Sequence, residues 1–591
     1  MFTEKLARAA SSAVKSLYNI EIEPDSLVIN KTRKEYKGDY TLVVFPLAKS
    51  AHKSPDQTGH EIGDWLKDNM PEISHFNVVK GFLNITLKDV FWLDFLKNCG
   101  FDASYGFKPV DNTHPPVLIE FSSPNTNKPL HLGHIRNNLL GHSISEILRA
   151  TGRRIVKVNL VNDRGIHICK SMLAWQKWGN GETPASAGMK GDHLVGKYYV
   201  MFDKHYKTEV EELKNRGMEE ETAQRNAPLM MEAQEMLRRW ENNDPEVVEL
   251  WKMMNGWVYE GFDETYRRLG ISFDKTYYES DTYLLGKKIV DEGLQKGVFF
   301  RKEDGSVWVD LTDEGLDQKL LLRSDGTSVY ITQDLGTAQL RYDEYHPNKM
   351  IYVVGNEQNY HFEVLSHVLQ KLGKPYADMI FHLSYGMVEL PHGKMKSREG
   401  TVVDADDLMD EMYETARQIT LELGKAAELD EASADLLFHR VGMAALKYFI
   451  LKVDPKKNML FNPAESIDFD GNTGPFIQYT HARIASVLRK AGEWTATFTN
   501  LEVKPEEKEV LRLLYDFPAV IKEAADEMNP GTVANYCYEV ARTYNQFYHN
   551  LSILHEPDES RMFFRLALSK LTATVIRNGM YLLGIEVPEQ M

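Results

Sequence analysis

The stretch that decides the fold is residues 117–137, which read VLIEFSSPNTNKPLHLGHIRN. Its first five residues are mostly apolar and β-prone, which predicts a short buried strand. Pro124 and Pro129 rule out regular structure in the segment that follows. Beyond Gly133 apolar residues recur at helical spacing, and residues 154–161, RIVKVNLV, form a second β-like run. The sequence therefore predicts a β-loop-α-β unit, a motif whose crossover is right-handed.

Two histidines lie where this helix is expected to begin. His131 and His134 are three residues apart, so they share one face of the first turn. Free N–H groups and the helix dipole favour an anion there, and imidazoles donate hydrogen bonds to phosphate oxygens. Gly133 has no side chain that would block a base or ribose. The pattern indicates a phosphate-binding site beyond the carboxyl ends of the strands; the alternative is a pair of ordinary helix-capping histidines.

The composition limits the class of protein. A chain of 591 residues is long enough for roughly two to four domains. The net charge of −17 excludes a generally basic nucleic-acid coat but permits local basic faces. Cys99, Cys169 and Cys537 are far apart and form no Cys-x-x-Cys pair, which argues against a disulfide framework and against a cysteine-rich zinc site.

No targeting or membrane segment is recognisable. Residues 1–17 mix charged and apolar side chains and indicate an amphipathic helix of the folded protein rather than a signal peptide. No run reaches the ~18 apolar residues that span a bilayer. We therefore expect a cytoplasmic protein with no membrane partner.

Three regions of the chain differ in pattern. Residues 1–110 predict an N-terminal α+β domain. Residues 111–410 predict a Rossmann-like domain with a doubly wound parallel sheet, interrupted at about 190–300 by acidic, helix-rich sequence that we interpret as an insertion. Residues 411–591 predict a C-terminal helix bundle. The β-like runs outside the first unit are residues 40–45, 82–87, 307–309, 350–354 and 379–382. The expected fold class is multidomain, α/β plus all-α.

A second informative segment, residues 393–400, reads GKMKSREG. Together with the first segment it resembles the two signatures of class I aminoacyl-tRNA synthetases, the "HIGH" motif and the "KMSKS" loop. More narrowly, the chain resembles arginyl-tRNA synthetases over essentially its whole length. The stretches that carry this resemblance are EFSSPN at 120–125, VNDRG at 161–165, YITQD at 330–334, DGNTGP at 470–475 and LGIEVPE at 583–589.

The resemblance implies two reactions in one site. The carboxylate of arginine attacks the α-phosphate of ATP, which binds with Mg²⁺, so that pyrophosphate leaves and arginyl-adenylate forms. The 2′-hydroxyl of the terminal tRNA ribose then takes the arginyl group. The resemblance also implies that residues 1–110 contact the tRNA elbow, that the helical domain reads the anticodon, and that bound tRNA is needed for arginine activation. We expect arginine, ATP and the cognate tRNA as partners, no protein-bound zinc, and a monomer.

The resemblance also implies the catalytic residues. They are His131, His134, Lys128 and Lys394, and the ATP-binding set adds Gly133, Lys396 and Arg398. Lys394 would bring a cation to the leaving pyrophosphate; for such a lysine alone, a solvated hairpin tip is the alternative. The loop departs from the family pattern because its fourth position is Ser397 and not lysine. Arginyl-tRNA synthetases compensate with the lysine before the first motif, here Lys128, and which of Lys128, Lys396 and Arg398 contacts phosphate stays open.

Arginine recognition requires carboxylates, because a planar, permanently charged guanidinium pairs with them through two parallel hydrogen bonds. By the family pattern the arginine-binding residues are Glu120, Ser123, Asn125, His134, Tyr330, Asp334 and Gln358. Glu120 and Asp334 would accept from the guanidinium, with Tyr330 beside it. The alternatives are a strand-end or turn aspartate for Asp334 and a polar helix-start residue for Gln358. The expected tRNA-binding residues are Gly471, Asn472, Gln478, Tyr479 and Arg483.

Two rival interpretations predict different features. Another class I synthetase or a related nucleotidyltransferase would share the phosphate machinery, but the Ser-Ser-Pro-Asn lead and the Tyr-x-x-x-Asp spacing argue against it. A non-catalytic tRNA-binding or scaffold protein would show damaged catalytic signatures. His131, Gly133, His134 and Lys394 are all present, which favours an enzyme.

Overall fold

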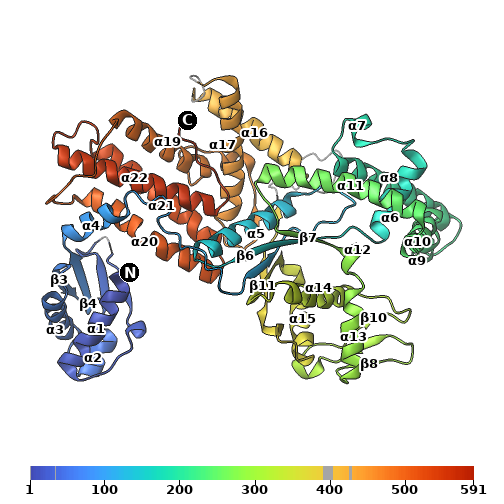
Figure 1. Ribbon diagram of the computed structural model, residues 1–591, viewed down its shortest axis with the longest axis horizontal. Coiled ribbons are helices and arrows are strands. Elements are labelled where there is room, and N and C mark those ends of the chain that lie inside the picture. The colour runs from blue at the N-terminus through green and yellow to red at the C-terminus, as the bar shows by residue number, and fades with distance from the viewer. Residues whose placement is uncertain (1, 34, 390–402, 425–428) are drawn as a thin grey trace. The chain divides into compact units, whose positions relative to one another are not determined.

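The computed structural model describes residues 2–33, 35–389, 403–424 and 429–591 (Figure 1). The chain forms two compact units. The first consists of Met1–Ala103, Val487–Tyr515 and Thr543–Thr574. The second consists of Ser104–Ser486, Asp516–Arg542 and Val575–Met591. The helical region predicted for residues 411–591 is therefore shared between the two units.

The first unit contains a four-stranded antiparallel sheet with the strand order β1-β2-β4-β3. Its strands are β1 (Ile29–Lys31), β2 (Tyr40–Val43), β3 (Ile73–Val79) and β4 (Phe82–Leu87), and its amino-terminal helices are α1 (Phe2–Tyr18), α2 (Phe45–Ala51), α3 (Pro55–Asn69) and α4 (Asp89–Cys99). The predicted strands at 40–45 and 82–87 and the predicted opening helix are present. The helix α1 buries Phe2, Leu6 and Val14 on one face, as its amphipathic pattern requires.

The second unit is built on a five-stranded sheet in which every neighbouring pair is parallel. Its strands are β5 (Val117–Glu120), β6 (Ile155–Val161), β7 (Lys275–Tyr278), β11 (Lys349–Gly355) and β12 (Ile380–Tyr385). The order across the sheet is β12-β11-β5-β6-β7. From β5 the chain adds β6 and β7 toward one edge of the sheet. It then returns to the centre and adds β11 and β12 toward the other edge, so the order reverses between β5 and β11. Ligands bind at such a switch point, outside the carboxyl ends of the two central strands.

The predicted β-loop-α-β unit is present as β5, α5 (Leu132–Ala150) and β6. The helix packs closely on the strand, because a Cβ at Gly141 would lie 2.2 Å from the ring of Phe121. Arg136, fully buried on the same helix, donates to the carbonyl oxygens of Met387 and Lys457 over 2.9 and 2.7 Å. These contacts fix the helix whose amino terminus faces the switch point.

The helical insertion begins and ends earlier than the predicted bounds of about 190–300. Its helices are α6 (Ile166–Trp178), α7 (Pro184–Ala187), α8 (Gly191–Asn215), α9 (Glu220–Asn226), α10 (Pro228–Glu241) and α11 (Pro245–Leu269). The strand β7 follows and pairs with β6, so residues 275–278 belong to the main sheet and not to an insertion that reaches residue 300. This strand has only four residues, KTYY, which are too few to give a readable periodicity.

A small antiparallel sheet, β10-β9-β8, follows the insertion. Its strands are β8 (Phe299–Arg301), β9 (Val307–Val309) and β10 (Lys319–Leu322), and the nearby helices are α12 (Glu279–Thr282), α13 (Leu285–Gln295), α14 (Tyr330–Tyr345) and α15 (Asn359–Lys371). The predicted run at 307–309 is a strand, but it lies in this separate sheet. Side chains of α13, α14, α15 and the main sheet share one hydrophobic core, and α13 packs against α14 (Figure 1).

The chain beyond residue 404 is almost wholly helical, as predicted. Its helices are α16 (Ala405–Glu422), α17 (Glu431–Leu451), α18 (Pro463–Ser466), α19 (Gly474–Ala491), α20 (Pro505–Glu527), α21 (Pro530–Asn550) and α22 (Glu559–Leu582). A short parallel pair, β13 (Val388–Glu389) and β14 (Met459–Leu460), links this region to the segment after β12. Among the described residues, no helix is both long and apolar enough to cross a membrane.

Candidate active site

The first signature forms the amino-terminal cap of α5. His131 precedes the helix in an extended conformation, and its Nδ1 accepts a hydrogen bond from the backbone N–H of Gly133 over 3.1 Å. The backbone N–H of His131 donates to Nδ1 of His134, also over 3.1 Å. Because both Nδ1 atoms accept, the proton of each neutral imidazole is on Nε2. Each ring therefore caps the helix and still carries an Nε2–H donor, so the capping and the phosphate-binding interpretations are compatible.

Both imidazoles are neutral at physiological pH. Burial lowers the pKa of His131 to about 4, and the cation of Lys128 contributes to the shift. Burial also holds the pKa of His134 well below its usual value, and His131 and Lys128 lower it further. The two ring centroids are 3.9 Å apart. The pair can therefore act as hydrogen-bond donors to an anion but not as a charged imidazolium.

The cation of Lys128 lowers the pKa of both histidines, and its contact with phosphate stays a prediction. A Cβ at Gly133 would lie 2.9 Å from Cε1 of His131, so the imidazole lies over this glycine. The predicted phosphate contacts of Lys394, Lys396 and Arg398 lie outside the described residues and stay predictions.

The loop after β5 has an unusual backbone. Ser122 and Ser123 have φ angles of 79° and 49°, in the left-handed region that non-glycine residues rarely adopt. Two asparagines hold this conformation: the N–H of Ser122 donates to Oδ1 of Asn137 over 2.5 Å, and the N–H of Ser123 donates to Oδ1 of Asn159 over 2.9 Å. Such strain costs about 1–3 kcal/mol per residue and is concentrated at ligand sites. The Ser-Ser-Pro-Asn lead is thus a rigid turn at the switch point.

Residues 403–405 lie antiparallel to residues 130–132, where an isolated bridge pairs His131 with Asp404. Backbone hydrogen bonds of 2.9 and 3.0 Å flank the bridge. Asp404 is also the amino-terminal cap of α16, and its Oδ1 accepts from the N–H of Asp406 over 2.8 Å. The beginnings of α5 and α16 are therefore fixed to each other beside the signature histidines.

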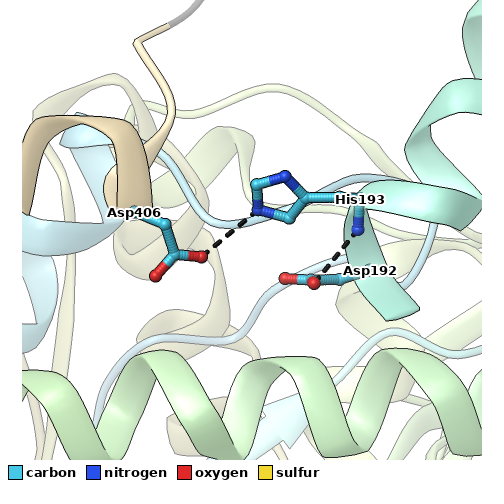
Figure 2. A group of neighbouring side chains, drawn as sticks. All are labelled: Asp192, His193 and Asp406. Carbon is cyan, nitrogen blue, oxygen red and sulfur yellow. Dashed lines mark hydrogen bonds and ion pairs between the residues drawn. The ribbon is translucent and has the colours of Figure 1, made fainter. Parts of the chain in front are cut away.

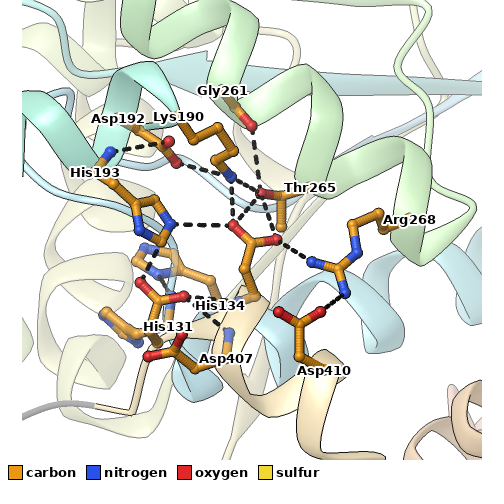
Figure 3. Close-up of polar contacts among 12 residues, drawn as sticks. His131, His134, Lys190, Asp192, His193, Gly261, Thr265, Arg268, Asp407 and Asp410 are labelled. Atoms are coloured by element: carbon orange, nitrogen blue, oxygen red, sulfur yellow. Dashed lines mark hydrogen bonds and ion pairs between the residues drawn. The ribbon is translucent and has the colours of Figure 1, made fainter. Parts of the chain in front are cut away.

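A charged cluster joins α16 to the helical insertion. The imidazole Nε2 of His193, at the start of α8, lies 3.2 Å from Oδ2 of Asp406 (Figure 2). The ammonium of Lys190 contacts the same carboxylate, and Arg268 of α11 donates to its other oxygen over 3.0 Å (Figure 3). Burial raises the pKa of Asp406, but these three partners outweigh burial and hold it well below its usual value. The cluster therefore fixes the start of α16, and with it residues 403–405.

The same cluster contains one group of three possible metal ligands among the described residues. Asp192, His193 and Asp406 have ligand atoms within 4.8 Å of one another. The ammonium of Lys190 lies 3.2 Å from Oδ2 of Asp192 and also contacts Asp406. A metal ion does not fit there, because the carboxylates already surround a cation of the protein.

Glu120, predicted to bind arginine, is paired inside the protein. It lies at the end of β5 and forms an ion pair with Arg341 of α14, a fully buried residue. Its Oε1 accepts a hydrogen bond from the hydroxyl of Ser123 over 3.0 Å. The carboxylate of Glu120 raises the pKa of Arg341 against the opposing effect of burial. Oε1 of Glu120 therefore accepts a hydrogen bond, while Oε2 has Arg341 as its ion-pair partner but accepts no hydrogen bond from the described residues.

Asp334, the second predicted acceptor, also has an internal partner. Its Oδ2 lies 2.5 Å from Nε2 of His361 on α15. Burial raises the pKa of Tyr352 to about 12, and the charges of Glu120 and Asp334 contribute to the increase. Both carboxylates therefore act electrostatically on the buried phenol of Tyr352 on β11, and their contact with arginine stays a prediction.

The remaining predicted arginine-binding residues differ in exposure. Tyr330 is the first residue of α14 and is 81% exposed. Asn125 is exposed and pairs with Asn162, after β6, in a parallel backbone bridge. Gln358 is exposed at the end of a 3₁₀ turn, Asn356–Gln358, where it precedes α15. The last position agrees with the helix-start interpretation and leaves the side chain accessible.

The predicted tRNA-binding residues lie in α19 and the loop before it. Gln478 is fully buried, and its amide donates to the carbonyl oxygen of Glu586 over 2.7 Å. The prediction that Gln478 contacts tRNA is therefore wrong, because the side chain has no surface to offer. Asn472 accepts from the hydroxyl of Tyr448 over 2.6 Å. Gly471 lies next to Asp468. The guanidinium of Arg483 lies over the ring of Tyr479, 4.8 Å from its centroid.

Sequence reasoning missed several residues of this region. Arg341 and His361 pair with the two predicted carboxylates, and Lys190, His193 and Arg268 fix the start of α16. No local signal marks Arg341, because Asp343 and Glu344 follow it in the same helix and the surrounding sequence is mixed. No sequence pattern connected the others, because their partners are far away along the chain.

Comparison with known proteins identifies the family. The model described as "tRNA synthetases class I (R), catalytic domain" matches residues 105–462. The "Arginyl tRNA synthetase N terminal domain" matches residues 4–87, and the "DALR anticodon binding domain" matches residues 477–591. The chain belongs to the arginyl-tRNA synthetases. It is therefore a class I aminoacyl-tRNA synthetase, an enzyme that attaches arginine to tRNA.

Individual relatives agree with this assignment. The chain is 59% identical to an arginine–tRNA ligase of Bacteroides thetaiotaomicron, over 100% of this chain and 99% of the relative. It is 56% identical to one from Porphyromonas gingivalis strain W83, with the same coverage. The structure of Thermus thermophilus arginyl-tRNA synthetase superposes with a TM-score of 0.78 at 25% identity, covering 100% of both chains. An arginyl-tRNA synthetase from Plasmodium falciparum has the same fold, with a TM-score of 0.77 at 20% identity.

Class I synthetases use ATP, generally with Mg²⁺, and arginyl-tRNA synthetases act on arginine and tRNA. The charged cluster around Asp406 does not suit Mg²⁺, since Lys190 already lies among its carboxylates. Mg²⁺ usually binds through the phosphates of the nucleotide itself, with few protein ligands. The histidine pair offers N–H donors, which suit phosphate oxygens and not a metal ion.

Proposed function

We propose that the chain forms arginyl-adenylate at the switch point between β5 and β11, with Lys128, His131 and His134 on the nucleotide phosphates. The observation that carries this proposal is the pair of neutral imidazoles at the start of α5, each with an Nε2–H donor. Their position combines two side-chain donors with the positive end of a helix dipole. Lys128 adds a positive charge next to them.

In the proposed reaction, a carboxylate oxygen of arginine bonds to the α-phosphorus of ATP, and the bond to the pyrophosphate oxygen breaks. The 2′-hydroxyl of the tRNA ribose then attacks the carbonyl carbon of arginyl-adenylate, loses its proton, and releases AMP. Such transfers depend mainly on positioning and on stabilising developing charge. The two imidazole donors and Lys128 would supply that stabilisation, while the rigid turn at Ser122 and Ser123 would position the amino acid.

Arginine would bind at the carboxyl ends of the central strands. We assign its guanidinium to Asp334, which is partly exposed one helical turn after Tyr330 on α14, and we place Glu120 beside this site as a second carboxylate that stays paired with Arg341. The amino and carboxylate groups of the substrate would contact Ser123, Asn125, His134 and Gln358. Mg²⁺, when it accompanies ATP, would neutralise phosphate charge.

The proposed tRNA contacts are in both terminal regions. Residues 1–110 would contact the elbow of the tRNA, and the helical region from residue 411 would read the anticodon. Gly471, Asn472, Tyr479 and Arg483 are the proposed contacts near the start of α19. The chain would act as a monomer in the cytoplasm, and size-exclusion chromatography with light scattering tests the oligomeric part of this proposal.

The decisive experiment is ATP–pyrophosphate exchange with each amino acid in turn, with and without cognate tRNA. We expect arginine to be the only amino acid that supports exchange, and we expect this exchange only when tRNA is bound. Exchange supported by another amino acid would contradict the assigned pocket, and exchange of equal rate without tRNA would contradict the proposed requirement for tRNA.

A further inference from the structure

The two carboxylates assigned to the arginine pocket are paired with cations of different kinds. Glu120 is paired with Arg341, and Asp334 is paired with His361. A guanidinium keeps its proton at every accessible pH, whereas an imidazole can lose its proton near neutrality. The two pairs therefore respond differently to a substrate that brings a positive charge of its own.

The Glu120–Arg341 pair is permanent. The side chain of Arg341 is 1% exposed, and that of Glu120 is 10% exposed. The guanidinium also lies over two aromatic rings, 5.1 Å from the centroid of Tyr277 and 5.5 Å from that of Tyr352. Removing one partner of a buried pair leaves an uncompensated charge, so an incoming arginine cannot displace Arg341. Glu120 is therefore largely neutralised before the substrate binds.

The Asp334–His361 pair is exchangeable. The side chain of Asp334 is 33% exposed, and that of His361 is 24% exposed. Asp334 lies one helical turn after Tyr330, so the two share a face of α14, and Tyr330 is 81% exposed. The carboxylate of Asp334 is thus the acceptor that a solvent-borne guanidinium can reach. It has to exchange its contact with His361 for one with the substrate.

We propose that His361 is a positioning residue that holds the carboxylate of Asp334 while protonated and gives it up to the guanidinium of arginine by losing its proton. The inference rests on the proposed function, since it assumes that arginine binds at Asp334. The charge is conserved in the exchange: one proton leaves His361 for solvent as one guanidinium joins Asp334. His361 therefore competes with the substrate and does not take part in the chemical steps.

The charges around His361 agree with this exchange. Burial lowers its pKa, but the hydrogen bond and the negative charge of Asp334 outweigh burial and raise the pKa above the usual value. On β12, His382 faces His361 across the ring of Phe362, and its own pKa is lowered, chiefly by burial. On α12, Glu279 carries the same negative charge as Asp334, and the cation of Arg164 offsets the charge of Glu279. Asp334 is thus the dominant charge that His361 meets.

The sign of the pH dependence follows. Below its pKa, His361 is protonated and occupies Asp334, so arginine must compete with a bound cation. Above its pKa, His361 is neutral and the carboxylate is available. The KM for arginine should therefore fall as the pH rises through this pKa, with a limiting slope of about tenfold per pH unit on the acid side, and then become constant.

The test is the KM for arginine in tRNA-dependent ATP–pyrophosphate exchange, measured from pH 6 to pH 9 with the native chain, with His361→Gln and with His361→Lys. Gln keeps a hydrogen-bond donor without a charge, so we expect a low and pH-independent KM. Lys carries a permanent charge over this range, so we expect a raised KM that changes little with pH. The KM for ATP, measured in parallel, should be the same in all three proteins.

A matched variant separates this effect from other titrations. His193 also has a raised pKa, because the hydrogen bond to Asp406 and the charge of Asp404 outweigh the effect of burial. His193→Gln should retain the pH dependence of the arginine KM that His361→Gln abolishes. A native KM that does not change with pH, or a dependence that survives in His361→Gln, would overturn the inference.

One further variant keeps the two proposals distinguishable. If Asp334→Asn leaves the KM for arginine unchanged, the assigned pocket is wrong and the role of His361 fails with it. If Asp334→Asn raises this KM while His361→Gln behaves like the native chain, the pocket stands and only the proton-coupled exchange is wrong. Should His361→Gln fail to fold, His361→Lys still decides, since a KM equal to that of the native chain at high pH would contradict the competition.

Discussion

The backbone N–H of Leu132 donates a hydrogen bond to the carbonyl oxygen of Val403 over 2.9 Å, and this contact joins the first signature to the segment that precedes α16. Asp406, three residues further along, receives Lys190, His193 and Arg268 from the helical insertion. The insertion is therefore more than a peripheral addition, because it fixes the residues beside the signature histidines.

The first prediction concerns this cluster. Asp406→Asn removes the charge that binds three cationic side chains, so the start of α16 should shift relative to His131. A displacement of about 1 Å near reacting groups lowers the rate by about 10²-fold. We expect such a loss in kcat for exchange, with the KM for arginine changed much less. Asp410→Asn is the control, because Asp410 contacts the same Arg268 but is 68% exposed. Equal kcat values for the two variants would contradict the idea.

Lys128 tests the nucleotide site. Its ammonium lies near both imidazoles, and Lys128→Ala should reduce the kcat of exchange by about 10²–10³-fold, the loss typical of a removed transition-state contact. The melting temperature should be unchanged. Lys204→Ala, on an exposed position of α8, controls for the loss of a surface charge. Near-native exchange in Lys128→Ala would indicate that Lys396 or Arg398, and not Lys128, contacts the phosphate.

Asp334 tests the guanidinium site. Asp334→Asn keeps the shape of the side chain but removes a charged acceptor, so the KM for arginine should rise by about tenfold to a hundredfold. The control is Asp343→Asn, an exposed aspartate on the same helix that accepts from Gln339 over 2.9 Å. Both KM values come from the same exchange assay, and an equal effect at the two positions would point to a general electrostatic cause.

The Glu120–Arg341 pair predicts a stability effect. Arg341→Met leaves a buried carboxylate without its cation and should lower the free energy of unfolding by about 3–5 kcal/mol. The double variant with Glu120→Gln should lose less than Arg341→Met alone, because no unpaired charge remains. Urea denaturation followed by circular dichroism measures the difference, and strictly additive losses would show that the pair is not coupled.

Arg483 and Gln478 should separate binding from stability. Arg483→Ala should raise the KM for tRNA and weaken its dependence on salt, as expected when one phosphate contact is lost. Gln478→Ala removes buried hydrogen bonds to the carbonyl oxygens of Arg440 and Glu586, so it should lower the free energy of unfolding by about 1–3 kcal/mol without changing the KM for tRNA. Titration of charging activity with tRNA at several salt concentrations distinguishes the two effects.

Sequence patterns predicted the framework of the site because its elements carry strong periodic signals. The runs at 117–121 and 154–161 are strands at Val117–Glu120 and Ile155–Val161, and the helix between them starts at Leu132. Buried parallel strands are apolar on both faces, so they can be read without knowledge of their neighbours. The order of the strands, and with it the switch point, came only with the structure.

The pairing of charged residues could not be read in this way. Arg341 and His361 are single residues within helices, and nothing local shows that one faces Glu120 and the other Asp334. The same reason explains the error at Gln478, because a polar residue on a helix gives no signal that its face is covered. The limit of the insertion was missed because β7 is too short to have a pattern.

The two capping imidazoles have one more consequence. Their Nδ1 atoms are committed to the backbone and their pKa values lie far below neutrality, so a fall of one pH unit inside a cell leaves their donors unaltered. Acidification would then weaken the binding of arginine before it changed the contacts with the nucleotide. Slower charging in an acidified cell would be reversed by a larger supply of arginine, and a larger supply of ATP would have little effect.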